Sequence, residues 1–579
     1  MTLERQSGDT TTNDDGTSRV LLARMGLAEW RSDPARDVVP TQLEALVRHH
    51  AGDARWDALS SQLDRFAAVV ATVIEPAVTT LERPENVPRH VAYDEFGNHV
   101  ERIEFHPAYE VAGTGVWDSG LLACNRGGDR ALEQTALFYL LSHVGEGGHG
   151  CPAVCTAGLA RALARRGSPA PALRSYIDGL YRSDYATCLR GSQFLTEVQG
   201  GSDVGANEMH ATPDGVSAWR LTGEKWFCSV ADADLFAITA RPRGAGSGTR
   251  GLTSFLVPRT LDGVHPNGFR IRRLKDKLGT RCMASAEMEF ANALAWPIGE
   301  LDEGFHVAVE ELLNTSRWLN AVGSTGLMRR AYLEASTYAV HRTAFGRSIG
   351  TFPAVRALLA SVKIAEHAAL ASTVAVAHLR ENLDIGSSGN GEVGAFRVLV
   401  NANKFVTSLW ATEAIHRCIE VLGGNGTIED FSPLPRLYRD SLVYESWEGS
   451  HNVLCAQIQR DLGRPAIADE CIRWVKSRAD GLGSDHRRVI TARLDILAGV
   501  LLRDAEGGDS GSIAFREDLV GFVEIVQATE LLRALSDRSA RTFEQVATEL
   551  LSREATSTLP RDLERIDMIL GDDLDSSQL

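Results

Sequence analysis

The stretch "ESWEGSHNV" (445–453) contains two acidic side chains that could act as a base. Glu445 and Glu448 lie three residues apart, and a Gly-Ser pair follows the second one directly. A carboxylate beside Trp447 would be partly shielded from water, which raises its pKa toward the range useful to a general base. The same letters also describe a helix that gives way to a turn. The local sequence leaves both interpretations open.

The loop "FLTEVQGGSDVGANEM" (194–209) could bind an anion. Gly200 and Gly201 let the backbone approach a ligand closely. Thr196 and Ser202 add hydroxyl groups, and exposed N–H groups in such a turn can hold an anion. An ordinary turn has the same composition. The loop is not a Walker A loop, and we find no GxGxxG motif at a strand-to-helix junction.

The segment "GEKWFCS" (223–229) is typical of a strand with aromatic side chains. Trp226 and Phe227 could be a pair of core residues. They could equally form a flat wall with a polar tip at Ser229, which would suit an isoalloxazine ring.

Together these motifs resemble the acyl-CoA dehydrogenase family. "LTEVQGGSD" followed by "GEKWFCS" is similar to the family's flavin signature. "HRTAFGRSIGTFPAV" (341–355) resembles its Arg-x-x-Phe-Gly segment, and "EVLGGNGTIEDFSPLPRLYRDSLVYESWEGS" (420–450) resembles its Gly-Gly-x-Gly, Arg-Asp and Glu-Gly-Ser/Thr sequence. The motifs occur in family order, and the resemblance covers residues 130–460.

A narrower resemblance points to the AidB-like branch, which carries an extra helical C-terminal domain. The segments that carry it are Gln199, Ser229, "RLKDKLGTR" (273–281), "WEGSHN" and "ERPENVPRHVAYDEFGNHVERIEFHPAY" (82–109). The segment after Arg464 is similar to that domain in length and in its helical sequence pattern.

The family fold, and the helical and strand periodicities along the chain, predict an α+β multidomain protein. The resemblance implies an N-terminal α-helical domain, a middle β-barrel or β-sandwich domain, a C-terminal four-helix bundle and an extra C-terminal helical domain. The expected boundaries are 41–189, 190–298, 299–463 and 464–579, after a disordered or extended N-terminus at 1–40.

The resemblance implies FAD as the cofactor and assigns residues to it. Those expected at the flavin, its ribityl chain and its diphosphate are Phe194, Thr196, Gly201, Ser202, Trp226, Phe227, Ser229, Ser450 and Asn452. Those expected at the adenosine diphosphate of an adjacent subunit are Arg342, Phe345, Gly423 and Gly424. A guanidinium independently matches diphosphate geometry, which favours such a role for Arg342.

The resemblance also implies the reaction. Glu448 would remove the α-proton of an acyl thioester while the β-hydride passes to flavin N5, and Arg317 would support the base. The thioester oxygen would accept hydrogen bonds from the N–H of Glu448 and from a flavin ribityl hydroxyl. Three positions depart from the residues common in the family, namely Glu420, Thr427 and Ala344. The AidB-like branch shares the acidic side chain found here at Glu420. None of these departures removes the base.

The amino-acid composition restricts the classes of partner and the location that we expect for the protein. The 579 residues carry a net charge of −16, so nucleic acid is disfavoured as a partner. No apolar run approaches the ~20 residues of a membrane span, the N-terminus lacks the apolar core of a signal peptide, and the nine cysteines show no CxxC pair. We therefore expect a cytoplasmic protein without a metal site. The family resemblance implies the remaining partners, namely an acyl thioester of CoA or of a carrier protein, an unidentified electron acceptor, and copies of the chain itself in a homotetramer built from dimers.

Three other functions are compatible with the resemblance. The first is a nucleic-acid-associated flavoprotein of the alkylation response, like AidB, but residues 460–579 carry more acidic than basic side chains. The second is a flavin monooxygenase, which would not need Glu448 as a base. The third is a non-catalytic scaffold, which the number of predicted ligand positions disfavours.

Overall fold

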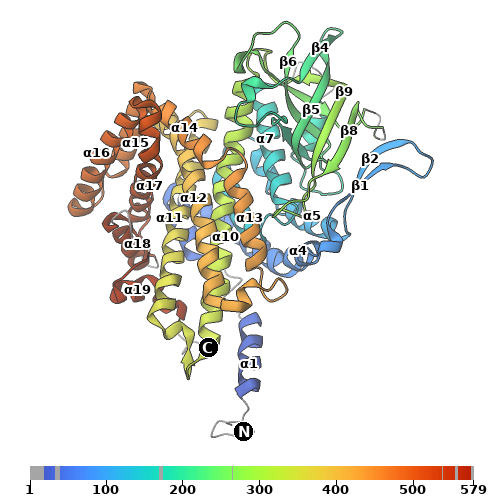
Figure 1. The fold of residues 1–579 in the computed structure, drawn as a ribbon. Helices are drawn as coiled ribbons and strands as arrows, with labels where there is room; N and C mark the ends of the chain where they lie inside the picture. The colour runs from blue at the N-terminus through green and yellow to red at the C-terminus, as the bar shows by residue number, and fades with distance from the viewer. Residues whose placement is uncertain are drawn as a thin grey trace, which may run out of the picture.

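The structure is a computed structural model that describes residues 19–32, 39–167, 174–261, 263, 265–536, 539–553 and 559–574. A β domain lies against one side of a long helical bundle, and the C-terminal helices cover the opposite side (Figure 1). The order of helices, strands, helices and further helices is the one that the sequence predicts. The exact domain boundaries stay a prediction.

The N-terminal segment contains a helix where we expected disorder. Helix α1 (Arg19–Ser32) ends near Trp30, whose side chain is 1% exposed. The Trp30 indole N–H donates to the carbonyl oxygen of Glu334 at 3.1 Å, and its ring stacks on Phe431 at 5.2 Å. The prediction of a disordered 1–40 is therefore wrong for residues 19–32, because a buried tryptophan anchors them. Residues 1–18 and 33–38 lie outside the described residues.

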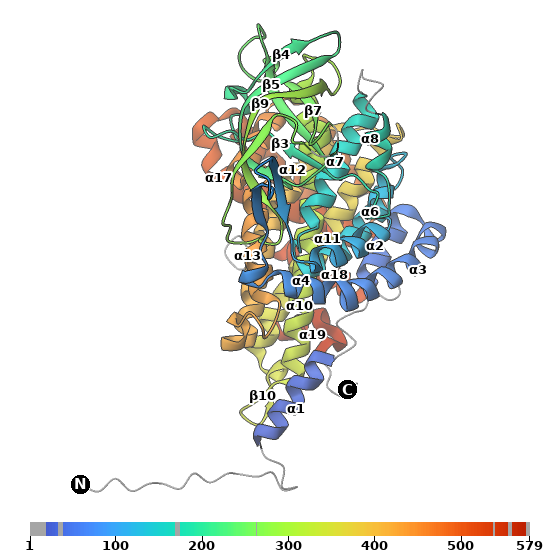
Figure 2. The ribbon, with the colours of Figure 1, turned by 90° about the vertical axis from the view of Figure 1, so that its right-hand side faces the viewer.

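The helices before the β domain form a layer against the bundle (Figure 2). All residues of α6 are buried, and this helix packs between the layer and the bundle helices. The elements of this segment are α2 (Thr41–Ala51), α3 (Asp53–Val69), α4 (Glu75–Leu81), β1 (Arg89–Tyr93), β2 (His99–Glu104), α5 (Ala108–Asp118), α6 (Ala131–Leu141), α7 (Gly150–Arg166) and α8 (Arg174–Gly179).

The β domain is a barrel, in agreement with the predicted β-barrel or β-sandwich. Its strands are β3 (Gly191–Phe194), β4 (His210–Asp214), β5 (Ala218–Ser229), β6 (Leu235–Pro242), β7 (Thr253–Pro258), β8 (Phe269–Leu274) and β9 (Ser285–Pro297). The pairing runs β6-β4-β5-β9-β7 and returns from β7 to β6, which closes the ring. Strand β3 adds to β6 in parallel, and β8 adds to β9. The aromatic rings of Phe236, Phe255 and Phe290 fill the interior.

A β-bulge changes the direction of two side chains of β5. Lys225 pairs with Met288 and Cys228 with Ala286, so two residues of β5 lie opposite one residue of β9. Such bulges occur next to functional sites, where they redirect a side chain. As a result the Trp226 and Phe227 rings both approach Lys275 Nζ, at 3.6 and 4.6 Å from their centroids.

The bundle that follows consists of long helices, as predicted. They are α9 (Gly304–His306), α10 (Asn314–His341), α11 (Pro353–Asp384), α12 (Glu392–Leu422), α13 (Leu434–Ser446) and α14 (His451–Leu462), with the short hairpin β10 (Thr343–Ala344) and β11 (Arg347–Ser348) between α10 and α11. Helix α11 is long and apolar enough to cross a membrane by length and composition, but 94% of the relevant window is buried inside the protein. Its apolar residues belong to the bundle core.

The C-terminal extension packs directly on the bundle. Its helices are α15 (Pro465–Arg478), α16 (Ser484–Glu506), α17 (Gly508–Arg533), α18 (Ala540–Ser552) and α19 (Leu563–Leu570). Helix α15 packs on α12, and α17 and α19 pack on α11. The buried residues of the extension and of the bundle form one continuous core.

A buried ion pair joins helices α15 and α17 of the extension and contacts His50 of α2. Both oxygens of the fully buried Glu530 accept hydrogen bonds from Arg478, at 2.7 and 2.8 Å, and His50 Nε2 lies 3.3 Å away. Burial raises the pKa of Glu530, but Arg478 and His50 outweigh burial and hold this pKa well below its usual range. His49, His50 and Glu530 are close enough to share a metal ion. Because Arg478 occupies both carboxylate oxygens, we propose no metal here.

We expect Glu530→Ala to destabilise the protein by about 3–5 kcal/mol, because it leaves the largely buried Arg478 guanidinium without its carboxylate partner. Urea unfolding and limited proteolysis of the extension measure the effect. The control is Glu517→Ala, an exposed glutamate of the same helix, for which the change should stay within about 0.5 kcal/mol. Equal stability of the two variants would refute the role of this ion pair.

Candidate active site

The predicted base lies in a short loop with an unusual backbone. Helix α13 ends at Ser446 and α14 begins at His451. Between them, Glu448 has φ = 58° and Gly449 has φ = 100°. A non-glycine residue in the left-handed region is uncommon, and strain of this kind persists only where surrounding contacts fix it. The loop therefore needs an anchor.

Two buried cations provide that anchor. Arg317 of α10 donates from Nε to the carbonyl oxygen of Glu448 at 2.9 Å. Lys404 of α12 donates from Nζ to the carbonyl oxygens of Glu445 and Gly449, at 3.0 and 3.1 Å. Arg317 is itself held, since its Nη1 donates to the side-chain oxygens of Asn401 and Gln457 at 2.7 and 3.0 Å. The base loop, which comprises residues 447–450, and the end of α13 before it are thus fixed at three backbone carbonyl groups.

The Glu448 carboxyl group has an environment suited to proton transfer. Burial raises its pKa to about 6, although Arg317, Lys404 and a hydrogen bond from Gln193 act in the opposite direction. Gln193 Nε2 donates to Glu448 Oε1 at 3.1 Å and to Ser316 Oγ at 2.8 Å. Gln193 lies in β3, so the β domain contributes one contact to the base and the bundle contributes the two cations.

The backbone N–H of Glu448 is available to a ligand. Within the described part of the chain, no acceptor bonds to it. One residue therefore presents both a carboxylate that can take a proton and a donor that can bind an oxygen. This pair of groups is what removal of a proton beside a carbonyl requires, because the negative charge develops on the carbonyl oxygen.

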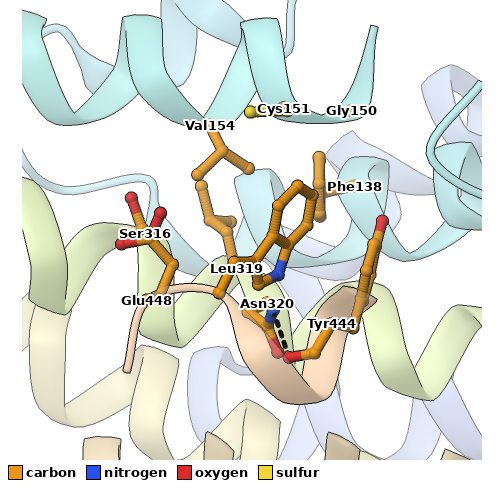
Figure 3. A pocket seen from close by; sticks show the side chains of 10 residues that line it. Phe138, Gly150, Cys151, Val154, Ser316, Leu319, Asn320, Tyr444 and Glu448 are labelled. Atoms are coloured by element: carbon orange, nitrogen blue, oxygen red, sulfur yellow. Dashed lines mark hydrogen bonds between the residues drawn. The ribbon is translucent and has the colours of Figure 1, made fainter. Parts of the chain in front are cut away.

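The base lines a narrow cavity (Figure 3). Glu448 and Ser316 lie at one end and Tyr444 and Phe138 at the other. The full lining comprises Phe138, Gly150, Cys151, Val154, Ser316, Leu319, Asn320, Tyr444, Trp447 and Glu448. The cavity measures about 20 Å³, which is room for about one water molecule. A ligand larger than this can enter only if lining side chains move.

The raised pKa of Glu448 gives a testable pH dependence. A base works in its ionised form, so activity should rise with pH through about 6 and reach a plateau above it. Below pH 6, kcat/KM should fall about tenfold per pH unit. A pH profile of kcat/KM between pH 4.5 and 8 measures this. A profile that stays flat down to pH 5 would contradict the assignment of Glu448.

Several residues predicted for the flavin lie together on the β domain. The N–H of Trp226 donates to the carbonyl oxygen of Thr196 at 2.9 Å, which joins β5 to the glycine-rich loop. Phe227 is 53% exposed, and Trp226 and Ser229 beside it are half-buried. A Cβ atom at Gly201 would lie 2.5 Å from Thr196 Oγ1, so this position needs glycine. Ser202 is exposed, whereas Phe194 is a fully buried core residue.

These features fit a bound flavin. An exposed aromatic side chain on a strand loses contact with water when a flat ring covers it, which stabilises the complex. Gly200, with φ = 149°, has no neighbour within 4 Å of a Cβ position, so a ligand can approach the backbone there. Ser450 and Asn452 are exposed at the start of α14, next to the base loop. Individual contacts of these residues with FAD stay predictions.

The residues predicted for the adenosine end lie far from this site. Arg342 and Phe345 follow the C-terminal end of α10, and Phe345 is 96% exposed with φ = 53°. Gly423 and Gly424 are exposed at the same end of the bundle, where Asn425 Nδ2 donates to the Tyr338 hydroxyl at 3.1 Å. Arg317 lies near the other end of α10, about 37 Å away at roughly 1.5 Å per residue. One FAD molecule cannot touch both clusters of one subunit.

The sequence prediction missed two residues of the site. Lys404 and Gln193 lie far from the base loop along the chain, and only the fold brings them to Glu448. A signal for Lys404 did exist: it is a charged residue that directly precedes the apolar pair Phe405 and Val406 in α12, and it is 0% exposed. A fully buried lysine is rare unless it is paired. Glu445, as predicted, points away from the cavity; its Oε2 lies 3.8 Å from His451 Nδ1.

Comparison with known proteins identifies the class to which this fold and site belong. Residues 192–293 match the acyl-CoA dehydrogenase middle domain, and residues 302–463 match the acyl-CoA dehydrogenase C-terminal domain. The chain is 32% identical to the AidB protein of Escherichia coli over 444 residues, which cover 73% of this chain and 77% of that protein. The chain belongs to the acyl-CoA dehydrogenase family and is an FAD-dependent oxidoreductase of that family.

The N-terminal region places the chain in the AidB-like branch. Residues 38–187 match the N-terminal domain of the adaptive response protein AidB. The structure of Caenorhabditis elegans ACDH-11 in complex with C11-CoA has the same fold, with a TM-score of 0.82 and 24% identity, over 93% of this chain and 92% of that one. An acyl-CoA dehydrogenase of Bacillus anthracis complexed with FAD also shares it, with a TM-score of 0.68 and 17% identity, over 95% of this chain and 91% of that one.

Proposed function

We propose that this protein dehydrogenates an acyl-CoA between its α and β carbons, with Glu448 as the base. The observation that carries the proposal is the arrangement at Glu448 itself. Its carboxyl group, with a pKa raised to about 6, lines a cavity, and its own backbone N–H is free to bind the thioester oxygen. Family membership alone would not supply this geometry, because a fold can persist after its activity is lost.

The chain contributes the proton transfer and the positioning. The Glu448 carboxylate takes the α-proton, and its N–H stabilises the charge that develops on the thioester oxygen. Arg317 and Lys404 hold the loop so that both groups face the cavity. Phe227 and Trp226 would hold the flavin ring, and Thr196 with Ser202 the neighbouring loop. FAD, when bound, supplies the acceptor for the β-hydride.

CoA is the proposed carrier of the acyl group. The structure of ACDH-11, which covers 93% of this chain, is a complex with C11-CoA, and this supports CoA as the carrier. Because the cavity is narrow, the acyl chain must displace lining side chains such as Trp447 and Leu319 as it enters.

The proposed enzyme works as an oligomer. Arg342, Phe345, Gly423 and Gly424 lie too far from Glu448 to share its FAD, so they would serve the adenosine end of a neighbouring subunit's cofactor. A homotetramer built from dimers, as the family resemblance implies, provides such neighbours. Light scattering of the purified protein measures the assembly, and a monomer that retains FAD would contradict it.

Product analysis tests the proposed function. Purified protein is incubated with a panel of saturated acyl-CoAs and an artificial electron acceptor, and the products are analysed by mass spectrometry. The proposal predicts that at least one acyl-CoA loses two hydrogen atoms. If no acyl-CoA does so, dehydrogenation of CoA thioesters is wrong. Oxygen incorporation into a product would point instead to monooxygenase chemistry.

A further inference from the structure

The C-terminal extension places an arginine beside the predicted cofactor residues. Arg516 lies in α17 and reaches the start of α14. Its Nη1 donates to Asn452 Oδ1 at 3.3 Å, and its Nη2 lies 3.4 Å from His451 Nδ1. The guanidinium stacks over the Phe405 ring at 5.3 Å from the centroid. Neither the sequence motifs nor the family match, which ends at residue 463, includes this residue.

Arg516 has no carboxylate partner within the described residues. It is half-buried, and none of the ion pairs among the described side chains includes it. The carboxylate of Glu445 lies 3.8 Å from His451 Nδ1, and no ion pair joins it to the arginine. A half-buried guanidinium without an anion leaves its capacity for charge-assisted hydrogen bonds unused.

Two further features near Arg516 favour an anion. Burial, together with the charges of Lys404 and Arg516, lowers the pKa of His451 to about 3, so His451 is neutral. Ser450 precedes the first turn of α14, whose N–H groups carry the positive end of the helix dipole. An unpaired guanidinium, a buried ammonium and a helix N-terminus therefore converge beside Asn452, and together they favour an anionic ligand.

We propose that Arg516 binds the diphosphate of FAD, so that the C-terminal extension completes the cofactor site. The inference rests on FAD as the cofactor and on the predicted place of Ser450 and Asn452 beside its ribityl and phosphate groups. A guanidinium forms two parallel hydrogen bonds to phosphate oxygens, which a lysine cannot do. The extension would then hold the cofactor as well as cover the bundle.

The test measures FAD affinity rather than activity. FAD is removed from wild type and from Arg516→Gln, and flavin fluorescence measures rebinding. The expected result is a Kd raised roughly ten- to hundredfold in Arg516→Gln, with a weaker dependence on NaCl concentration than in wild type. Arg516→Lys, which keeps the charge but not the planar fork, should give a smaller rise.

Controls separate a phosphate contact from a general loss of structure. Arg503→Gln changes an exposed arginine of the same extension, and its Kd should stay within about twofold of wild type. Riboflavin, which lacks phosphate, should bind wild type and Arg516→Gln equally. If the FAD-free Arg516→Gln protein melts at a lower temperature than wild type, Arg516→Lys takes its place in the comparison. An unchanged Kd for FAD, or an equal loss for riboflavin, would overturn the proposal.

Discussion

Replacing Glu448 by glutamine is expected to lower the rate of acyl-CoA oxidation by at least about 10³-fold while FAD stays bound. Glutamine keeps the size of the side chain and the hydrogen-bonding positions near Gln193, but it cannot accept the α-proton. The backbone N–H of residue 448 is unchanged, so substrate affinity should change little. Turnover with an artificial acceptor and the flavin absorbance of the purified variant measure the two quantities.

The matched control for this change is Glu445→Gln. Glu445 has the same side chain three residues earlier, but it faces His451 and does not line the cavity. Its contact with Lys404 is through the backbone carbonyl, which the substitution leaves intact. We expect activity within about twofold of wild type, as for other substitutions away from the reacting atoms. A comparable loss of activity in both variants would show that activity depends on negative charge in this loop and not on Glu448 as the base.

Arg317→Met is expected to lower kcat/KM by about 10²-fold and to raise the apparent pKa of the base above 6. The variant frees the Glu448 carbonyl, and displacements of about 1 Å at a reacting group can cost this much. It also removes the charge that opposes the effect of burial most strongly, so the pKa of Glu448 moves upward. Lys404→Met should shift the pKa in the same direction.

The pH profile distinguishes this role from simple structural support. A residue that only stabilised the fold would change the melting temperature and the protein yield but not the apparent pKa. The control is Arg460→Gln, an exposed arginine of α14 that makes no contact with the base loop. If Arg317→Met loses activity with an unchanged pH profile, the electrostatic part of the account is wrong.

The fold was predictable because its signals are local. Helical periodicity, strand alternation and glycine breaks lie within single elements, and they indicated the order of helices, strands, helices and further helices. The barrel and the bundle were implied by the family resemblance. The exception was α1. The polar N-terminal sequence predicted disorder there, but Trp30 is buried through its contacts with the distant Glu334 and Phe431. A short amphipathic helix is stabilised mainly by such packing, which its own sequence does not reveal.

The site was predictable only in part, for the same physical reason. Glu448 and Arg317 lie in motifs, whereas Lys404 and Gln193 reach the base through tertiary contacts. The β-bulge that turns Trp226 and Phe227 toward Lys275 depends on the pairing of β5 with β9, which spacing within β5 does not show. Arg516 belongs to a helix of the extension, where the resemblance assigned no role to any residue.

Anaerobic titration with acyl-CoAs tests the central claim most directly. Wild-type protein with bound FAD is titrated in the absence of oxygen while its visible absorbance is recorded, and Glu448→Gln with the same FAD content is titrated in parallel. The account predicts that one class of acyl-CoA bleaches the flavin of wild type and leaves that of Glu448→Gln unchanged on the same timescale. Bleaching of both proteins at similar rates, or of neither by any acyl-CoA, would contradict it.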